Sequence, residues 1–155
     1  EDSNSNLDAI CEACASMSQD KVGALILLTQ DNNLSEIVET GVKIDAIISK
    51  PLLENIFFKN SPLHDGAMVI ANNKIEAARC ILPITQNINL PGSYGLRHRA
   101  GIGITENSDC IAIVVSEETG SIRIIKSGRV HDVKASEMKA KIKELSKKDV
   151  ISIRN

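Results

Sequence analysis

The stretch "KVGALILLT", residues 21–29, decides the fold class of this 155-residue chain. It is a continuous apolar run without the alternation of a half-exposed strand, which is typical of a strand covered on both faces of its sheet. The segment before it, residues 6–18, carries apolar side chains at helical spacing: Leu7, Ile10, Cys11, Cys14 and Met17. A helix that leads into a strand buried on both faces indicates an α/β domain.

Turn and cap residues delimit the elements that follow. Ser49-Lys50-Pro51 offers a capping hydroxyl and then a proline in the first turn, which predicts a helix that ends near residue 58. Asn72-Asn73 is a two-residue turn that tolerates positive φ, so it predicts a hairpin. The remaining segments are a short helix over 34–38, an apolar segment over 44–48, strands over 67–71 and 74–84, and a helix over 96–106.

The last third of the chain has the pattern of an antiparallel meander. Three short apolar segments, "CIAIVVS" (110–116), "SIRIIK" (121–126) and "RVHDV" (129–133), are separated by tight joints. A polar helix over 136–145 and a basic tail follow. We therefore expect a single α/β domain over residues 1–155, with a central mixed, twisted β-sheet flanked by helices and a C-terminal helix and tail from about residue 135.

Composition limits the classes of function. The 18 basic and 20 acidic residues give a net charge of −2, which argues against a broad nucleic-acid surface. Aromatic residues make up 2% of the chain and tryptophan is absent, so repeated stacking platforms for single-stranded nucleic acid cannot form. The 43% of hydrophobic residues is enough for a folded core.

The cysteines and the ends of the chain carry weaker signals. Cys11 and Cys14 have metal-like spacing, but no second Cys or His pair completes a zinc site, so we interpret them as buried small residues on one helix face. The sequence contains neither a signal peptide nor an apolar run long enough to span a membrane. Because it begins at Glu1 without methionine, we expect a fragment whose membrane anchor would lie outside it.

Three polar clusters lie at predicted strand or helix ends, where ligands collect in α/β sheets. The first is His64-Asp65-Gly66-Ala67, either an ordinary turn that opens a hairpin or a catalytic carboxylate before a strand. The second is Gly95-Leu96-Arg97-His98-Arg99, either a solvated basic turn or a phosphate site. Successive helical residues point about 100° apart, so either the triplet lies at the helix start or one arginine is structural.

The third cluster is Ser116-Glu117-Glu118-Thr119-Gly120, after an apolar strand. It is either a polar hairpin turn or a carboxylate presented to a divalent cation. A carboxylate, a basic triplet and a second carboxylate together are the components of phosphoryl or nucleotidyl transfer, in which catalysis consists mainly of positioning and charge stabilisation. No Walker-type phosphate loop is present.

The order and separation of longer motifs resemble the diadenylate cyclase domain, most closely the cytosolic domain of the membrane-anchored type. The motifs are "KVGALILL" (21–28), "ETGVKIDAIISKPLLENIF" (39–57), "SPLHDGAMVI" (61–70), "GLRHRAGIGITE" (95–106) and "IAIVVSEETGSI" (111–122). The resemblance covers a core of about residues 7–132. It implies an enzyme that condenses two ATP molecules into cyclic di-AMP and two pyrophosphates with Mg²⁺ or Mn²⁺. It also implies a face-to-face homodimer, which could be part of a higher oligomer, and a cytoplasmic location next to a membrane.

The resemblance also implies roles for individual residues. Asp65, of the family's Asp-Gly-Ala motif, would deprotonate or orient the ribose 3′-hydroxyl, and His64, Asp65 and Glu118 would hold the cation. The residues that it assigns to ATP binding are Gly66, Ala67, Leu82, Leu96, Arg97, His98, Arg99, Ser116, Glu117 and Glu118. Among these, the Arg-His-Arg triplet would grip the triphosphate and the backbone of Leu82 would meet the adenine.

Two departures from the family pattern predict altered affinity rather than lost activity. Many relatives have threonine in place of Leu96, and some have an aromatic residue in place of Ile81.

Two alternative functions to the cyclase remain. A catalytically inactive nucleotide-binding regulatory module would not require the full charged set, and a metal-dependent phosphodiesterase would leave the Arg-His-Arg triplet poorly explained.

Overall fold

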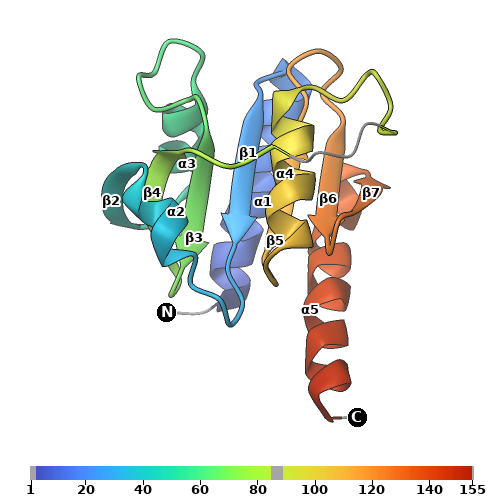
Figure 1. Cartoon of the computed structure of the whole chain (residues 1–155). Helices are drawn as coiled ribbons and strands as arrows, with labels where there is room; N and C mark the ends of the chain where they lie inside the picture. Colours follow the sequence, from blue (N-terminus) through green and yellow to red (C-terminus); the bar gives the residue numbers. More distant parts are fainter. Residues whose placement is uncertain (1–2, 85–88, 155) are drawn as a thin grey trace.

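The computed structural model describes residues 3–84 and 89–154, which form three layers with the sheet in the middle (Figure 1). Within these residues, seven strands form one mixed sheet in the order β2-β4-β3-β1-β5-β6-β7. The strands are β1 Ala24–Leu28, β2 Val42–Ile47, β3 Ala67–Ala71, β4 Lys74–Cys80, β5 Ile111–Val115, β6 Ile122–Lys126 and β7 Arg129–Val133. The helices are α1 Ser3–Asp20, α2 Ser35–Glu39, α3 Lys50–Phe57, α4 Leu96–Glu106 and α5 Met138–Arg154, with a 3₁₀ turn, η1, over Ala135–Glu137.

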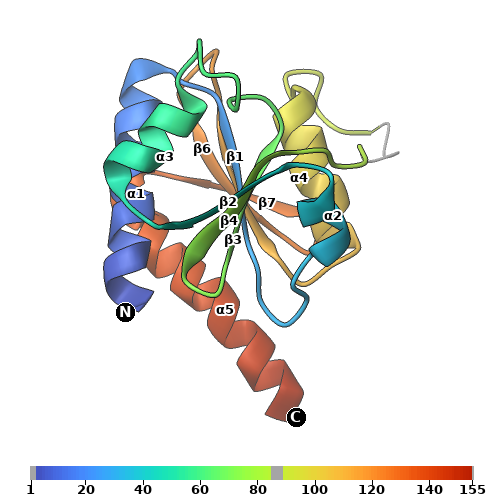
Figure 2. The same ribbon diagram turned by 90° about the vertical axis from the view of Figure 1, so that its left-hand side faces the viewer.

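Helices cover both faces of the sheet, as the central apolar strand predicts. Helices α1, α3 and α5 lie on one face and α2 and α4 on the other (Figure 2). Strand β1 alternates between the two cores: Ala24 and Ile26 pack with the first set of helices, whereas Leu25 and Leu27 pack with the second. Because all of β1 is buried, it has no polar face, and the predicted strand covered on both faces is confirmed.

Strand directions bring distant segments to one edge of the sheet. Strand β1 is parallel to β3 and antiparallel to β5, with Ala24 opposite Val115. Strands β1 and β3 therefore begin, and β5 ends, at the same edge. This edge receives the polar segments that precede β3 and follow β5, and α4 begins beside it (Figure 1).

Most local predictions are confirmed. Helix α4 spans the predicted residues 96–106, and the Ser49 hydroxyl caps α3 by accepting a hydrogen bond from the Leu52 N–H at 3.3 Å. Asn72 and Asn73 have φ of 55° and 61° in the turn between β3 and β4, which fits the two-residue hairpin.

Two predicted boundaries are wrong. Strand β4 ends at Cys80 instead of residue 84, because Cys80 is its last residue paired with β3 and the chain leaves the sheet before Pro83. Helix α5 continues to Arg154 instead of ending near residue 145 in a tail. The segment contains neither glycine nor proline, and its lysines are good helix formers, so nothing local stops it.

Candidate active site

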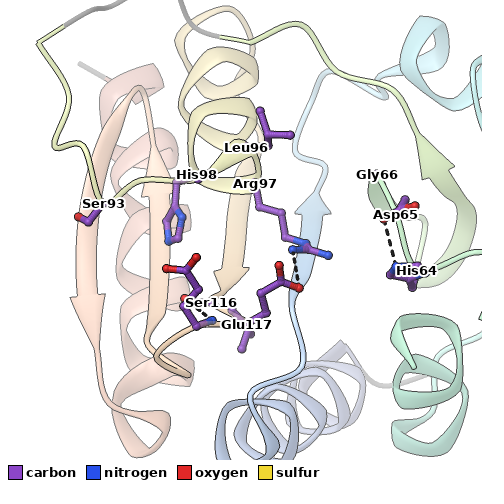
Figure 3. Close-up of a pocket in the computed structure, with 12 residues that line it drawn as sticks. His64, Asp65, Gly66, Ser93, Leu96, Arg97, His98, Ser116 and Glu117 are labelled. Atoms are coloured by element: carbon purple, nitrogen blue, oxygen red, sulfur yellow. Dashed lines mark hydrogen bonds and ion pairs between the residues drawn. The ribbon is translucent and has the colours of Figure 1, made fainter. Parts of the chain in front are cut away.

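A cavity of about 550 Å³ opens at the sheet edge where β1 and β3 begin and β5 ends (Figure 3). Its lining combines residues of all three polar clusters with neighbours that the sequence did not single out. The lining residues are His64, Asp65, Gly66, Ser93, Gly95, Leu96, Arg97, His98, Val115, Ser116, Glu117 and Glu118. The cavity therefore joins segments that are separated by up to about fifty residues in the sequence.

The N-terminus of α4 faces this cavity without a side-chain cap. Gly95 is the N-cap and has no side chain to accept from the first turn, and the Arg99 N–H makes the first helical bond, to the Gly95 carbonyl at 3.1 Å. The earlier N–H groups of the turn have no intrahelical acceptor. Free N–H groups at the positive end of the helix dipole form a ready site for an anion.

Arg97 points into the cavity, whereas Arg99 turns away from it. The Arg97 Nη1 lies 3.6 Å from Glu117 Oε1, and its Nε is buried with no hydrogen-bond partner among the described residues. The Arg99 Nε donates to the Tyr94 carbonyl at 3.2 Å, and Nη2 donates to the Pro91 carbonyl at 3.5 Å. The triplet thus lies at the helix start, and within it Arg99 braces the preceding loop.

Gly23, the residue directly before β1, leaves space for the Arg97 side chain. A Cβ added at Gly23 would lie 2.5 Å from Arg97 Nη1 and 2.6 Å from Cζ, closer than side-chain atoms approach. The guanidinium can therefore rest against the chain just before β1 only because residue 23 has no side chain. Gly23 lies within the apolar run at residues 21–29, but nothing in that run predicts that Arg97 packs against it.

His98 is buried in a cluster of side chains from three elements. Its ring stacks on Tyr94 with centroids 5.1 Å apart, and Arg123 Nη1 lies 2.9 Å from its Nε2. Arg123 also donates from Nε to Asp132 Oδ1 at 2.6 Å. Burial first, and then the Arg123 charge, lower the pKa of His98 to about 4, so this imidazole is neutral near pH 7.

The His64-Asp65 pair forms the opposite wall (Figure 3). His64 Nδ1 lies 2.8 Å from the Ser61 carbonyl, which can only accept, so Nδ1 carries the proton in that bond. His64 Nε2 lies 3.1 Å from Asp65 Oδ1, and the Asp65 side chain is 72% exposed. A ring nitrogen and a carboxylate oxygen at this distance need a proton or a cation between them. Next in the chain, Gly66 has φ +77°, and a Cβ there would lie 2.6 Å from the Cys80 carbonyl oxygen.

The turn after β5 supplies the carboxylates of the remaining wall. Ser116 Oγ accepts from the N–H groups of Glu118 and Thr119 at 3.1 and 3.2 Å, which closes the turn. Glu117 and Glu118 are exposed at the cavity. In residues 3–84 and 89–154, no group of three or more His, Cys, Asp or Glu side chains gathers as a ready metal site. The donors fit Mg²⁺ or Mn²⁺ shared with phosphate, because Mg²⁺ commonly takes one or two carboxylates plus substrate oxygens.

Three other residues that the resemblance assigns to ATP binding do not all lie at the cavity. Ala67 is buried in β3, and Leu82 is partly buried against the core under α4; neither lines the cavity. Leu96 does line it and is 72% exposed at its mouth. Ser93 and Val115 also line the cavity, although neither was predicted: Ser93 is a single hydroxyl outside the three polar clusters, and Val115 is one apolar residue of a strand among others.

The chain is similar to known proteins over most of its length. Residues 11–130 match the family described as DisA bacterial checkpoint controller nucleotide-binding. The chain is 42% identical over 125 residues to the cyclic di-AMP synthase CdaA of Bacillus subtilis, covering 81% of this chain and 46% of that protein. It is 43% identical over 141 residues to a diadenylate cyclase of Listeria monocytogenes, covering 90% of this chain and 52% of that protein.

Solved structures extend the likeness to three dimensions. A crystal structure of a double mutant of DacA from Staphylococcus aureus matches with a TM-score of 0.89 and 35% identity, covering 93% of this chain and 97% of that chain. A hypothetical membrane spanning protein from Bacillus cereus matches with a TM-score of 0.79 and 39% identity, covering 82% and 62%.

The chain belongs to the DisA bacterial checkpoint controller nucleotide-binding family, and the predicted fold and resemblance are confirmed. It spans about half the length of the curated relatives that it matches. Among the helices that the structure describes, none combines the length and the apolarity needed to cross a membrane.

Proposed function

We propose that this domain is a diadenylate cyclase, which condenses two ATP molecules into cyclic di-AMP and two pyrophosphates at the face of a homodimer. One observation carries the proposal: a single cavity joins an exposed carboxylate, Asp65, to an uncapped helix N-terminus and the guanidinium of Arg97. A triphosphate and a reacting hydroxyl need these two kinds of group at close range. The names of the Bacillus subtilis and Listeria monocytogenes relatives support the same reaction.

The α4 end of the cavity is suited to the triphosphate. Within the part of the chain that the structure describes, Arg97 has one long ion pair, to Glu117 at 3.6 Å, and an unpartnered Nε–H, so a phosphate oxygen can replace the weaker carboxylate contact. The first-turn N–H groups add donors at the positive end of the helix dipole. Arg99, which is held by backbone carbonyls, acts by fixing the loop that precedes this turn.

The Asp65 end is suited to the hydroxyl. An exposed carboxylate can accept the proton of a ribose 3′-hydroxyl, or orient it by a hydrogen bond. A divalent cation would be held by His64, Asp65 and Glu118 together with phosphate oxygens, and when bound it would neutralise phosphate charge. Because His64 Nδ1 donates to the Ser61 carbonyl, Nε2, which lies 3.1 Å from Asp65 Oδ1, is the ring nitrogen that faces a cation held there.

The need for a second copy follows from the stoichiometry of the reaction. Each transfer forms a bond between the 3′ oxygen of one ATP and the α-phosphorus of the other, and it breaks the bond from that phosphorus to pyrophosphate. Two such transfers close the ring, so two nucleotides must meet with opposite ends aligned. A cavity of about 550 Å³ is of the size for one nucleotide. Two chains face to face then supply both reactants.

The test measures product from the purified domain with ATP and Mn²⁺ across a range of protein concentrations. We expect cyclic di-AMP at a rate that rises more steeply than linearly with concentration, and no product from Asp65→Asn. Nucleotide binding without product, at concentrations where the dimer forms, would identify the regulatory module instead. Hydrolysis of added cyclic di-AMP would identify the phosphodiesterase.

We also propose that the domain works on the cytoplasmic side of a membrane to which an anchor outside this sequence attaches it. The support is the name of the Bacillus cereus structural neighbour, a hypothetical membrane spanning protein. Fractionation of cells that produce the whole protein, with the domain detected by antibody, tests this. Recovery of the domain in the soluble fraction would contradict it.

A further inference from the structure

His98 contacts the guanidinium of Arg123, to which the proposed reaction assigns no role. Arg123 Nη1 on β6 lies 2.9 Å from His98 Nε2, and Arg123 Nε donates to Asp132 Oδ1 on β7 at 2.6 Å. The guanidinium carbon also lies 5.2 Å from the centroid of the Tyr94 ring, which itself stacks on the imidazole. Arg123 is thus fixed by a carboxylate, an aromatic ring and the histidine together.

The direction of the bond between Arg123 and His98 follows from chemistry. A guanidinium has donors and no acceptor, and it stays protonated in proteins. Nε2 of His98 must therefore accept, which leaves the ring proton on Nδ1 and the ring neutral. Nδ1 has no hydrogen-bond partner in the part of the chain that the structure describes, and His98 lines the cavity.

The charges around His98 favour the same neutral state. Arg97 on its own helix and Arg123 on β6 are positive, and Asp132 on β7 is committed to Arg123. Glu117 and Glu118, on the turn after β5, line the same cavity but are exposed to solvent. A third cation between two guanidiniums would cost free energy in a buried position.

We infer that Arg123 is a positioning residue of the nucleotide site: it holds His98 as the neutral Nδ1–H tautomer, so that the ring gives one directed hydrogen bond to a phosphate oxygen and no positive charge. The identity of the ligand rests on the proposed function, whereas the state of the ring does not. A phosphate oxygen is an acceptor only, so a ring fixed as a donor needs no rearrangement when the nucleotide binds.

Nitrogen-15 NMR of the imidazoles in the whole chain at pH 7 tests the ring state directly. The chain has three histidines, and the His98 signals are assigned by their loss in His98→Gln. We expect a protonated Nδ1 and an unprotonated Nε2 in the wild type, and a mixture of tautomers in Arg123→Met, which removes the donors and keeps the stem. Arg129→Met, on an exposed arginine of β7, is the matched control and should keep the wild-type tautomer.

Binding of a non-hydrolysable ATP analogue to the same proteins tests the consequence. We expect Arg123→Met to weaken binding about tenfold, the effect of one misdirected hydrogen bond, and Arg129→Met to leave it unchanged. An Nε2–H tautomer or an imidazolium in the wild type at pH 7 would overturn the inference without any variant. A wild-type tautomer ratio or a wild-type affinity in a folded Arg123→Met would also overturn it. The ring state is measured without turnover, so a failure of the cyclase assay leaves the NMR result standing.

Discussion

Replacing Gly23 by alanine adds one methyl group at the point where the Arg97 guanidinium rests. The backbone of residue 23 does not need glycine, since its φ lies outside the left-handed region. The new Cβ would lie 2.5 Å from Nη1, 2.6 Å from Cζ and 3.0 Å from Nη2, whereas ordinary contact begins at 3.4 Å. The guanidinium must therefore move by about 1 Å, as can happen at the end of a flexible side chain.

This displacement should change the stability of the fold little but weaken the contact between Arg97 and the nucleotide substantially. Arg97 makes one long ion pair in the free protein, so we expect the free energy of unfolding to change by less than about 1 kcal/mol. A charge-assisted hydrogen bond to phosphate contributes about 1.5–3 kcal/mol, and a 1 Å misplacement forfeits much of it. At about 1.4 kcal/mol for each factor of ten, kcat/KM for ATP should fall by about 10- to 100-fold.

The assay compares kcat/KM and melting temperature across a double-mutant cycle. Gly92→Ala is the matched control, because a Cβ there meets no atom of the described residues within 4 Å, and it should keep wild-type turnover. In an Arg97→Ala background, Gly23→Ala should have no further effect, because its target is gone. A full additional loss in that background, or wild-type kcat/KM in Gly23→Ala alone, would refute the link between the two residues.

Three further predictions concern other parts of the molecule. Asp65→Asn should lower product formation at least about 100-fold without moving the melting temperature, because the side chain is 72% exposed; a chromatographic product assay and a thermal melt check this. The pKa of His98 is about 4 in the folded chain and near 6.5 when unfolded, so the unfolded state binds the proton first as pH falls. The free energy of unfolding should drop by up to about 3 kcal/mol between pH 6.5 and 4, and denaturant titrations should show a flatter profile in His98→Gln. Cys11→Ser and Cys14→Ala should keep turnover within about twofold, since burial raises the pKa of both thiols and neither lies at the cavity; a steady-state assay that shows a larger loss would contradict this.

The elements that the sequence predicted correctly are those specified by local chemistry. The buried run at β1, the Ser49 cap of α3 and the Asn72-Asn73 hairpin each depend on residues that are near neighbours in the chain. The two wrong boundaries have different causes. The end of β4 depends on where its partner strands end, and the length of α5 on the absence of a stop signal. Pairing partners cannot be read from one strand alone.

The site was predicted as a set of residue types but not as a geometry. The sequence does not distinguish the roles of Arg97 and Arg99. Only the fold shows that Arg99 donates hydrogen bonds to the Tyr94 and Pro91 carbonyls. One missed contact did have a signal. The two-residue turn between β6 and β7 fixes their register, and that register puts Arg123 directly opposite Asp132. The register does not show that His98 of α4 packs against Arg123 and Asp132.

The direction of β5 decides whether these parts form one site. Asp65 stands just before β3, and Glu118 stands just after β5, with β1 between the two strands. Because β3 is parallel to β1 and β5 is antiparallel to it, the start of β3 and the end of β5 share one edge. If β5 ran parallel, its end would lie at the opposite edge, about 17 Å away at 3.3 Å per residue. A carboxylate there could not share a cation with Asp65, so the mixed sheet is itself a requirement of the chemistry that we propose.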